Sequence, residues 1–215
     1  MGERANVRYI AGDALGAADA PLGLNPEVVA HLERAREAGL ALKLVANLPY
    51  SIATPLIVRL LEADLAGRLP FALLAATVQA EVAGRLTARA ITKEYGAPSA
   101  LVQALARAEV VRRVSRRAFF PPPRVESAMV LVVPRRPDDR FIDPVSYPRF
   151  RDLVRAVFQY RRKTVRNALA RGLGLEPAVA DRALRAAGVD PEARVESLAP
   201  AALAAVAAAL PGASS

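Results

Sequence analysis

The sequence has no cysteine and only one histidine among its 215 residues. Without cysteine there can be no disulfide framework, no thiolate nucleophile and no Cys-ligated zinc, and His31 alone is too little for a histidine-based site, so we expect no bound metal. Long hydrophobic runs are also missing. The longest late apolar stretch, residues 201–210, is about half a bilayer span, and Met1-Gly2-Glu3-Arg4 leads into no apolar signal segment. We therefore expect a cytoplasmic protein that does not interact with membranes.

Positive charge is what the sequence has in excess. Thirty Lys and Arg residues outnumber twenty-one Asp and Glu, and the net charge is +9. Two segments hold more than all of this charge, because residues 107–124 carry a net +5 and residues 149–171 a net +7. A mildly acidic body with two basic segments is the pattern expected when phosphates are the partner, although each segment alone could be a solvated face. The candidate RNA-binding residues are Arg112, Arg113, Arg116, Arg117, Arg161, Arg162, Lys163 and Arg166.

Apolar segments of strand length alternate with helical patterns through about two thirds of the chain. The predicted strands cover residues 7–11, 43–46 and 71–78, followed by an antiparallel pair at 110–114 and 127–133. The predicted helices cover residues 26–37, 54–64, 79–86 and 99–107, with Asn25, Thr54 and Ser99 as caps. This order predicts an α/β fold of the Rossmann-like type, in which ligands bind at the carboxyl ends of the strands.

A proline-rich segment separates this region from the rest. Residues 134–148 contain four prolines and several charges, and no strand-like segment follows them. We therefore place a domain boundary near Asp138 and predict an α/β domain of residues 1–138 and a small all-α domain of residues 139–215.

The predicted helical domain begins with a broken helix. The apolar face of residues 150–157 would turn toward Arg151 if the helix continued unbroken, so we predict a break at residues 159–161. The basic cluster of residues 161–163 then lies at an elbow between two helices, with Thr164 as the cap of the second.

Two groups of residues follow the first predicted strands. Asp13 could accept a hydrogen bond from a ligand's amino group, although Gly-Asp is also an ordinary turn. The run Asn47-Leu48-Pro49-Tyr50 is more specific. An exocyclic aromatic amine that attacks a methyl group needs acceptors for its two N–H bonds, and the Asn47 side chain and the Leu48 carbonyl can supply them. Pro49 would fix the turn and Tyr50 would offer a face for stacking, while the alternative is a common turn with a core tyrosine.

Two phenylalanines precede three prolines, which hold the chain extended. Phe119 and Phe120 could stack on a base taken out of its helix. The alternative is a place in the core, which the flanking arginines make less favourable for Phe119 than for Phe120.

Five motifs together resemble one known family. They are Asn47-Leu-Pro-Tyr-Ser-Ile-Ala-Thr-Pro-Leu56, Gln79-x-Glu81-Val82-Ala83-x-Arg85-Leu86, Tyr95-Gly96, Ala118-Phe119-Phe120-Pro-Pro-Pro-Arg-Val-Glu-Ser127 and Gln159-Tyr-Arg-Arg-Lys-Thr164. In this order and spacing they resemble the KsgA/RsmA family of ribosomal RNA adenine dimethyltransferases, from about Val7 to the C-terminus.

The resemblance implies a class I methyltransferase domain that uses S-adenosylmethionine to dimethylate two adjacent adenosines in the 3′-terminal hairpin of 16S rRNA. It implies that Asp13 contacts the cofactor adenine and that Asn47 is shared between cofactor and target base. Leu48, Pro49 and Tyr50 would complete the target site, and Phe119 would stack on the flipped adenine. The implied partner is 16S rRNA in the small ribosomal subunit, with the protein otherwise a monomer.

One part of the family pattern is missing. Members begin with a Glu-x-Gly-x-Gly-x-Gly signature followed by an acidic residue on the cofactor ribose. The sole Gly-x-Gly here, Gly172-Leu-Gly174, follows a predicted helix and is expected to be its C-cap. We therefore expect roughly the first third of the catalytic domain to be absent. Two alternatives stay open: an rRNA-binding assembly factor with impaired catalysis, and a resistance-type methyltransferase of large-subunit rRNA.

Overall fold

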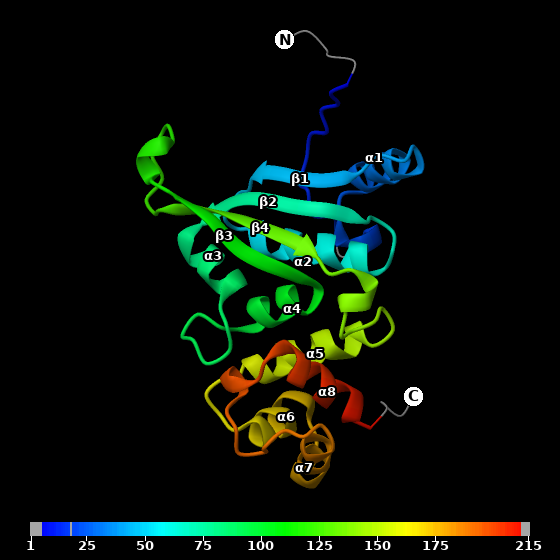
Figure 1. Cartoon of the computed structure of the whole chain (residues 1–215), viewed down its shortest axis with the longest axis vertical. Coiled ribbons are helices and arrows are strands. Elements are labelled where there is room, and N and C mark those ends of the chain that lie inside the picture. Colours follow the sequence, from blue (N-terminus) through cyan, green and yellow to red (C-terminus); the bar gives the residue numbers. More distant parts are fainter. Residues whose placement is uncertain (1–5, 18, 212–215) are drawn as a thin grey trace.

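The computed structural model describes residues 6–17 and 19–211; Met1-Gly2-Glu3-Arg4 lies outside them. In this part of the chain four strands form one sheet, in the order β1-β2-β4-β3 (Figure 1). The strands are β1 (Leu42–Asn47), β2 (Phe71–Gln79), β3 (Ala106–Val114) and β4 (Ser127–Pro134). β1 and β2 are parallel, and β4 is antiparallel to both β2 and β3, which confirms the predicted late antiparallel pair.

Eight α-helices accompany the sheet in the described residues. They are α1 (Pro26–Glu37), α2 (Ala53–Leu65), α3 (Ala80–Thr87), α4 (Ala97–Leu105), α5 (Tyr147–Phe158), α6 (Val165–Leu173), α7 (Pro177–Ala186) and α8 (Pro200–Ala209). Helices α2, α3 and α4 pack beneath the sheet, and α5 to α8 form a bundle below them (Figure 1). The later part of the chain is therefore helical, as predicted.

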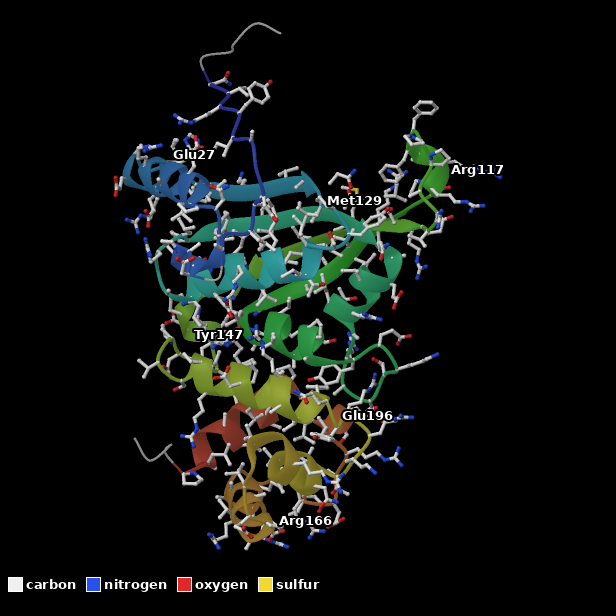
Figure 2. All side chains as sticks on the ribbon, turned by 180° about the vertical axis from the view of Figure 1, so that it is seen from behind. Glu27, Arg117, Met129, Tyr147, Arg166 and Glu196 are labelled. Atoms are coloured by element: carbon white, nitrogen blue, oxygen red, sulfur yellow. The ribbon has the colours of Figure 1, made fainter. Side chains whose placement is uncertain are left out.

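The two faces of the sheet differ in burial. On the face toward α2, α3 and α4, Val78, Val130 and Val132 are almost inaccessible to solvent. On the opposite face Val45 is 79% exposed, and Met129, labelled in Figure 2, is 40% exposed. Because side chains alternate across a strand, one complete apolar face forms the core while the other stays open in the described residues.

One hydrophobic core runs from beneath the sheet into the helical bundle. Tyr95, which precedes α4, is fully buried and packs edge-on against Phe158 of α5, with ring centroids 5.6 Å apart. Its hydroxyl donates a 2.8 Å hydrogen bond to the carbonyl of Leu198, before α8. Asp138 lies in a short 3₁₀ helix ahead of this interface, and the domain boundary near it stays a prediction.

Local signals explain several helix ends. The Asn25 side chain accepts from the backbone N–H groups of Glu27 and Val28, which caps α1 as predicted. Thr164 caps α6 by accepting from the Asn167 N–H at 3.4 Å, after the predicted break. Gly174 ends α6 with φ +65°, a left-handed conformation that favours glycine, so its role as a C-cap is confirmed.

Other local predictions are wrong. Residues 7–11 are not a strand, because none of the four strands pairs with them. The strand–helix–strand arrangement predicted for residues 7–11, 26–37 and 43–46 is therefore absent. Ser99 lies within α4, where its hydroxyl accepts from the Gly96 N–H at 3.0 Å and caps the helix from inside. Thr54 likewise lies in the first turn of α2, after an N-cap at Ile52.

Candidate functional site

A cavity of about 410 Å³ opens at the carboxyl end of β1. One wall is the turn that follows the strand, and the other is the segment after β3 that carries the phenylalanines and prolines. The lining residues are Asn47, Leu48, Pro49, Tyr50, Phe119, Phe120, Pro121 and Pro123. The structure thus brings together all five residues predicted for the target-base site, from segments about seventy residues apart.

The first wall presents two acceptors with no competing partner. The Leu48 N–H donates to the Thr77 carbonyl at 3.1 Å, which continues the pairing of β1 with β2 into the turn and orients the next peptide group. Within the described residues, neither the Asn47 side chain nor the Leu48 carbonyl has a hydrogen-bond partner. An amine entering the cavity would therefore not have to displace a protein donor.

Tyr50 and Phe119 are two of the three aromatic residues that line the cavity, and each is held by its surroundings. The Tyr50 hydroxyl lies 3.3 Å from the Ser127 hydroxyl, at the start of β4, and Ser127 is fully buried. Phe119 is half-buried and follows a 3₁₀ turn capped by Ser115. The cavity therefore has aromatic groups on both walls, and base stacking needs such surfaces.

One acidic residue holds the segment between β3 and β4 together and links it to the start of α3. A Glu126 carboxylate oxygen accepts from the Arg116 N–H at 3.0 Å, and the Glu126 carbonyl accepts from the Ala80 N–H at 3.0 Å. Figure 2 shows Arg117 at the protruding end of this segment. Arg112, Arg113, Arg116 and Arg117 are all exposed and form no ion pair within the described residues. Their charges are therefore available to an anionic partner.

The second basic group surrounds a cavity of about 780 Å³ between the loop before α4 and the elbow after α5. Arg161 is half-buried and structural, because it binds the Glu196 carboxylate at 2.9 Å and the Lys93 carbonyl at 3.0 Å. Arg162 and Lys163 line the same cavity and are exposed. Arg166 lies beyond it and pairs with Glu192 at 2.7 Å. The four residues predicted to bind RNA at the elbow therefore divide into two exposed charges and two that already have partners.

Both basic groups lie toward the same side of the molecule. The β3–β4 end and the elbow are at the left in Figure 1, and Arg117 and Glu196 are both at the right in Figure 2. An extended polyanion could follow this side from one group to the other.

Asp13 does not line the cavity that contains Asn47. Its side chain accepts from the Leu15 N–H at 3.0 Å, and its carbonyl accepts from the Asn25 side chain at 2.9 Å. The first of these bonds is typical of the ordinary turn that was the alternative interpretation of Asp13. The assignment of Asp13 and Asn47 to the cofactor stays a prediction.

Sequence reasoning missed three residues of these sites. Ser127 orients Tyr50, and Glu126 orients the segment between β3 and β4. Sequence reasoning gave neither residue a role of its own and included both only within a family motif. Lys93 contributes to the elbow cavity from a distant loop. The spacing of charges along the chain gave no signal for these long-range interactions.

The fold and the cavity define this chain as a class I methyltransferase fold with a helical C-terminal part. A dimethyladenosine transferase from Plasmodium falciparum superposes with a TM-score of 0.63 at 19% identity, covering 85% of this chain and 78% of that one. The 23S rRNA methyltransferase ErmE superposes with a TM-score of 0.53 at 21% identity, over 86% of this chain and 79% of that one. At such identities the likeness concerns the fold.

Sequence relatives identify the family. The family "Ribosomal RNA adenine dimethylase" matches residues 10–210, so the chain belongs to this family, as the motifs indicated. Ribosomal RNA small subunit methyltransferase A of Shouchella clausii is 37% identical over 91% of this chain, and that of Moorella thermoacetica is 40% identical over 91%. The chain spans 62% and 64% of the lengths of these two relatives.

Two further properties of the described residues bear on other functions. None of their helices is long and apolar enough to cross a bilayer. They also contain no cluster of three or more His, Asp or Glu side chains arranged to hold a metal ion.

Proposed function

We propose that the protein serves in the S-adenosylmethionine-dependent dimethylation of two adjacent adenosines in the 3′-terminal hairpin of 16S rRNA, during maturation of the small subunit. The observation that carries this proposal is the cavity in which the Asn47–Tyr50 turn faces Phe119. Membership of the adenine dimethylase family and the names of the curated relatives support it. We place the protein in the cytoplasm, as a monomer when it is not on the ribosome.

The cavity suits an aromatic amine. The adenine N6 amine is planar and carries two N–H donors, which the Asn47 side-chain oxygen and the Leu48 carbonyl would accept. Their dipoles would also stabilise the positive charge that develops on nitrogen as it gains a methyl group, and Tyr50 and Phe119 would stack on the base. S-adenosylmethionine supplies the methyl group in this reaction class, and we assign its binding to Asp13 and Asn47 only as a hypothesis.

The basic groups suit the rRNA backbone. Arginine side chains bind phosphates in a bidentate manner, and charges on one side of a molecule can follow a folded RNA. We assign phosphate binding to Arg112, Arg113, Arg116, Arg117, Arg162 and Lys163. Arg161 and Arg166 would act mainly through the loops that they hold, since both have carboxylate partners.

The Asn47→Ala variant tests the role of the cavity. We expect it to lose transfer of tritiated methyl groups to purified small subunits by about 100-fold or more, since it removes a preorganised acceptor at the reacting nitrogen. Binding to the subunit should stay within about two-fold. Asn167→Ala, an exposed position on α6, is the matched control. Methylation by Asn47→Ala at the wild-type rate would overturn the assignment, and labelling of large subunits alone would indicate the resistance-type activity.

A second function is favoured by one observation. Because Asp13 does not line the cavity that contains Asn47, the protein could bind rRNA as an assembly factor without methylating it. Calorimetry with S-adenosylmethionine separates the two functions. Binding together with methyl transfer supports the enzyme, whereas salt-sensitive binding to small subunits without measurable cofactor binding supports the assembly factor.

A further inference from the structure

Phe120 is the most exposed aromatic residue of the described chain. Its side chain is 100% exposed, although its neighbour Phe119 is half-buried in the cavity wall. Burying a phenylalanine stabilises a fold by about 1.5–3 kcal/mol, and the core obtains nothing from this one. The core alternative for Phe120 is therefore wrong, and its exposure has no explanation in folding.

The backbone around Phe120 is held firmly. Pro121, Pro122 and Pro123 follow directly and restrict φ, while the Phe119 N–H donates to the Arg116 carbonyl at 3.3 Å. Glu126, near the end of the segment, accepts from the N–H of Arg116 near its beginning, and its carbonyl accepts from the Ala80 N–H. The ring is thus presented on a backbone with little conformational entropy to lose on binding.

The surroundings of Phe120 favour a nucleic acid over an apolar partner. It lines the same cavity as Asn47 and Tyr50. Arg116, Arg117 and Arg124 lie within four residues of it and form no ion pair in the described residues. An exposed aromatic ring among unpaired arginines matches the surfaces that bind single strands, where bases stack and phosphates are neutralised.

We propose that Phe120 is a second stacking surface, which binds the nucleotide next to the one held between Tyr50 and Phe119. This inference rests on the proposed function and adds an interaction to the same site. When one adenosine is taken into the cavity, its neighbour loses a stacking partner, and the Phe120 ring replaces that partner at the rim. A substrate with two adjacent adenosines would then be held by both bases in each methylation.

The absence of tryptophan from the sequence allows a direct test. The Phe120→Trp variant of the whole chain contains a single indole, whose fluorescence is quenched when a base stacks on it. The probe is a short oligoadenylate, compared with an abasic oligomer of equal length and charge. We expect quenching by the oligoadenylate and little by the abasic oligomer. Val145→Trp is the matched control, because Val145 is 90% exposed and lines another cavity, beside α8.

The Phe120→Ala variant gives the affinity. We expect its thermal midpoint to equal that of the wild type, and its affinity for oligoadenylate to fall by about 5- to 150-fold, the range for loss of one stacked base. Equal quenching by both oligomers, or unchanged affinity in Phe120→Ala, would overturn the inference. So would concentration-dependent self-association that Phe120→Ala abolishes, since a second copy would then cover the ring.

These outcomes are separable from the failure of the proposed function. If Asn47→Ala abolishes methylation while Phe120→Ala binds oligoadenylate normally, the stacking inference fails and the proposed function stands. If no methylation is found but Phe120→Trp is quenched only by the oligomer with bases, stacking stands without the enzymatic activity.

Discussion

Single side chains at the site owe their roles to the groups that hold them. Ser127 orients the Tyr50 hydroxyl. The hydrogen bond from the Leu48 N–H to the Thr77 carbonyl fixes the backbone of Leu48 and so orients the Leu48 carbonyl. Elsewhere in the chain Tyr95 shows the same principle in a structural role. Its ring fills the space beside Phe158 while its hydroxyl satisfies the Leu198 carbonyl in the interior.

Tyr95→Phe should destabilise the protein by about 1–3 kcal/mol, because the Leu198 carbonyl would be left buried without a donor. Urea denaturation at pH 7 measures this. Tyr9→Phe is the control, since Tyr9 is 77% exposed and should change stability by a few tenths of a kcal/mol at most. A Tyr95→Phe variant as stable as the wild type would contradict the role of this hydrogen bond.

The same variant carries a pH signature. Burial raises the pKa of Tyr95 well above its ordinary value of 10.0. Above pH 10 the unfolded chain therefore releases a proton that the folded chain keeps, and the free energy of unfolding falls as pH rises. Wild type should lose about 1.4 kcal/mol per pH unit through Tyr95 there, and Tyr95→Phe should not. The difference between the two proteins should therefore shrink above pH 10.

At the scale of elements, one ion pair with a buried carboxylate joins three segments. Asp64 near the end of α2 accepts from the Phe71 N–H at the start of β2 at 2.9 Å. It also pairs with Arg140, after β4, at 2.8 Å. Burial raises the pKa of Asp64, although Phe71 and Arg140 both act to lower it. The pair therefore joins these segments at the cost of a desolvated charge.

Removing either partner of this pair should be strongly destabilising. Asp64→Ala should lower the free energy of unfolding by about 2–4 kcal/mol, since Arg140 would keep a half-buried charge without its partner and the Phe71 N–H would lose its acceptor. The double variant with Arg140→Ala should lose less than the sum of the single losses, because no unpaired charge remains. A double-mutant cycle in urea measures the coupling, and strict additivity would show that the two side chains do not stabilise each other.

For the whole molecule, the two basic groups on one side are the feature that would engage a large RNA. Arg162 and Lys163 are exposed at the elbow, while Arg161 is held by Glu196. The double variant Arg162→Ala with Lys163→Ala should reduce the slope of log affinity against log salt by about 1.4–1.8, because each phosphate that is no longer neutralised lowers the slope by about 0.7–0.9. Filter binding of small-subunit rRNA at several salt concentrations measures the slope.

The control is Arg171→Ala with Arg182→Ala, which removes two exposed charges of α6 and α7 outside the elbow cavity. If both double variants change the slope equally, total charge matters and the elbow has no special role in binding. If neither does, the elbow lies away from the RNA.

Local signals made much of this fold predictable. The Asn25 and Thr164 caps, the glycine end at Gly174 and the break after α5 depend on a few neighbouring residues, and all are present. The strand predicted at residues 7–11 is wrong because a strand also needs a distant partner, and none of the four strands pairs with these residues. Ser99 shows a smaller limit, because a cap can act from the third helical position as well as before the first.

The sequence by itself determined the family, the alternation of strands and helices, and the residues that could accept an adenine amine. Those properties depend on residue types and on spacing along one segment. Tertiary structure alone decided that Phe119 is half-buried while Phe120 is fully exposed, and that Arg161 is paired while Arg162 is exposed. It also gave the Asp13 side chain a turn partner in the Leu15 N–H, and Asp13 does not line the cavity of Asn47. Burial and pairing depend on which distant segments meet, and local pattern does not encode that.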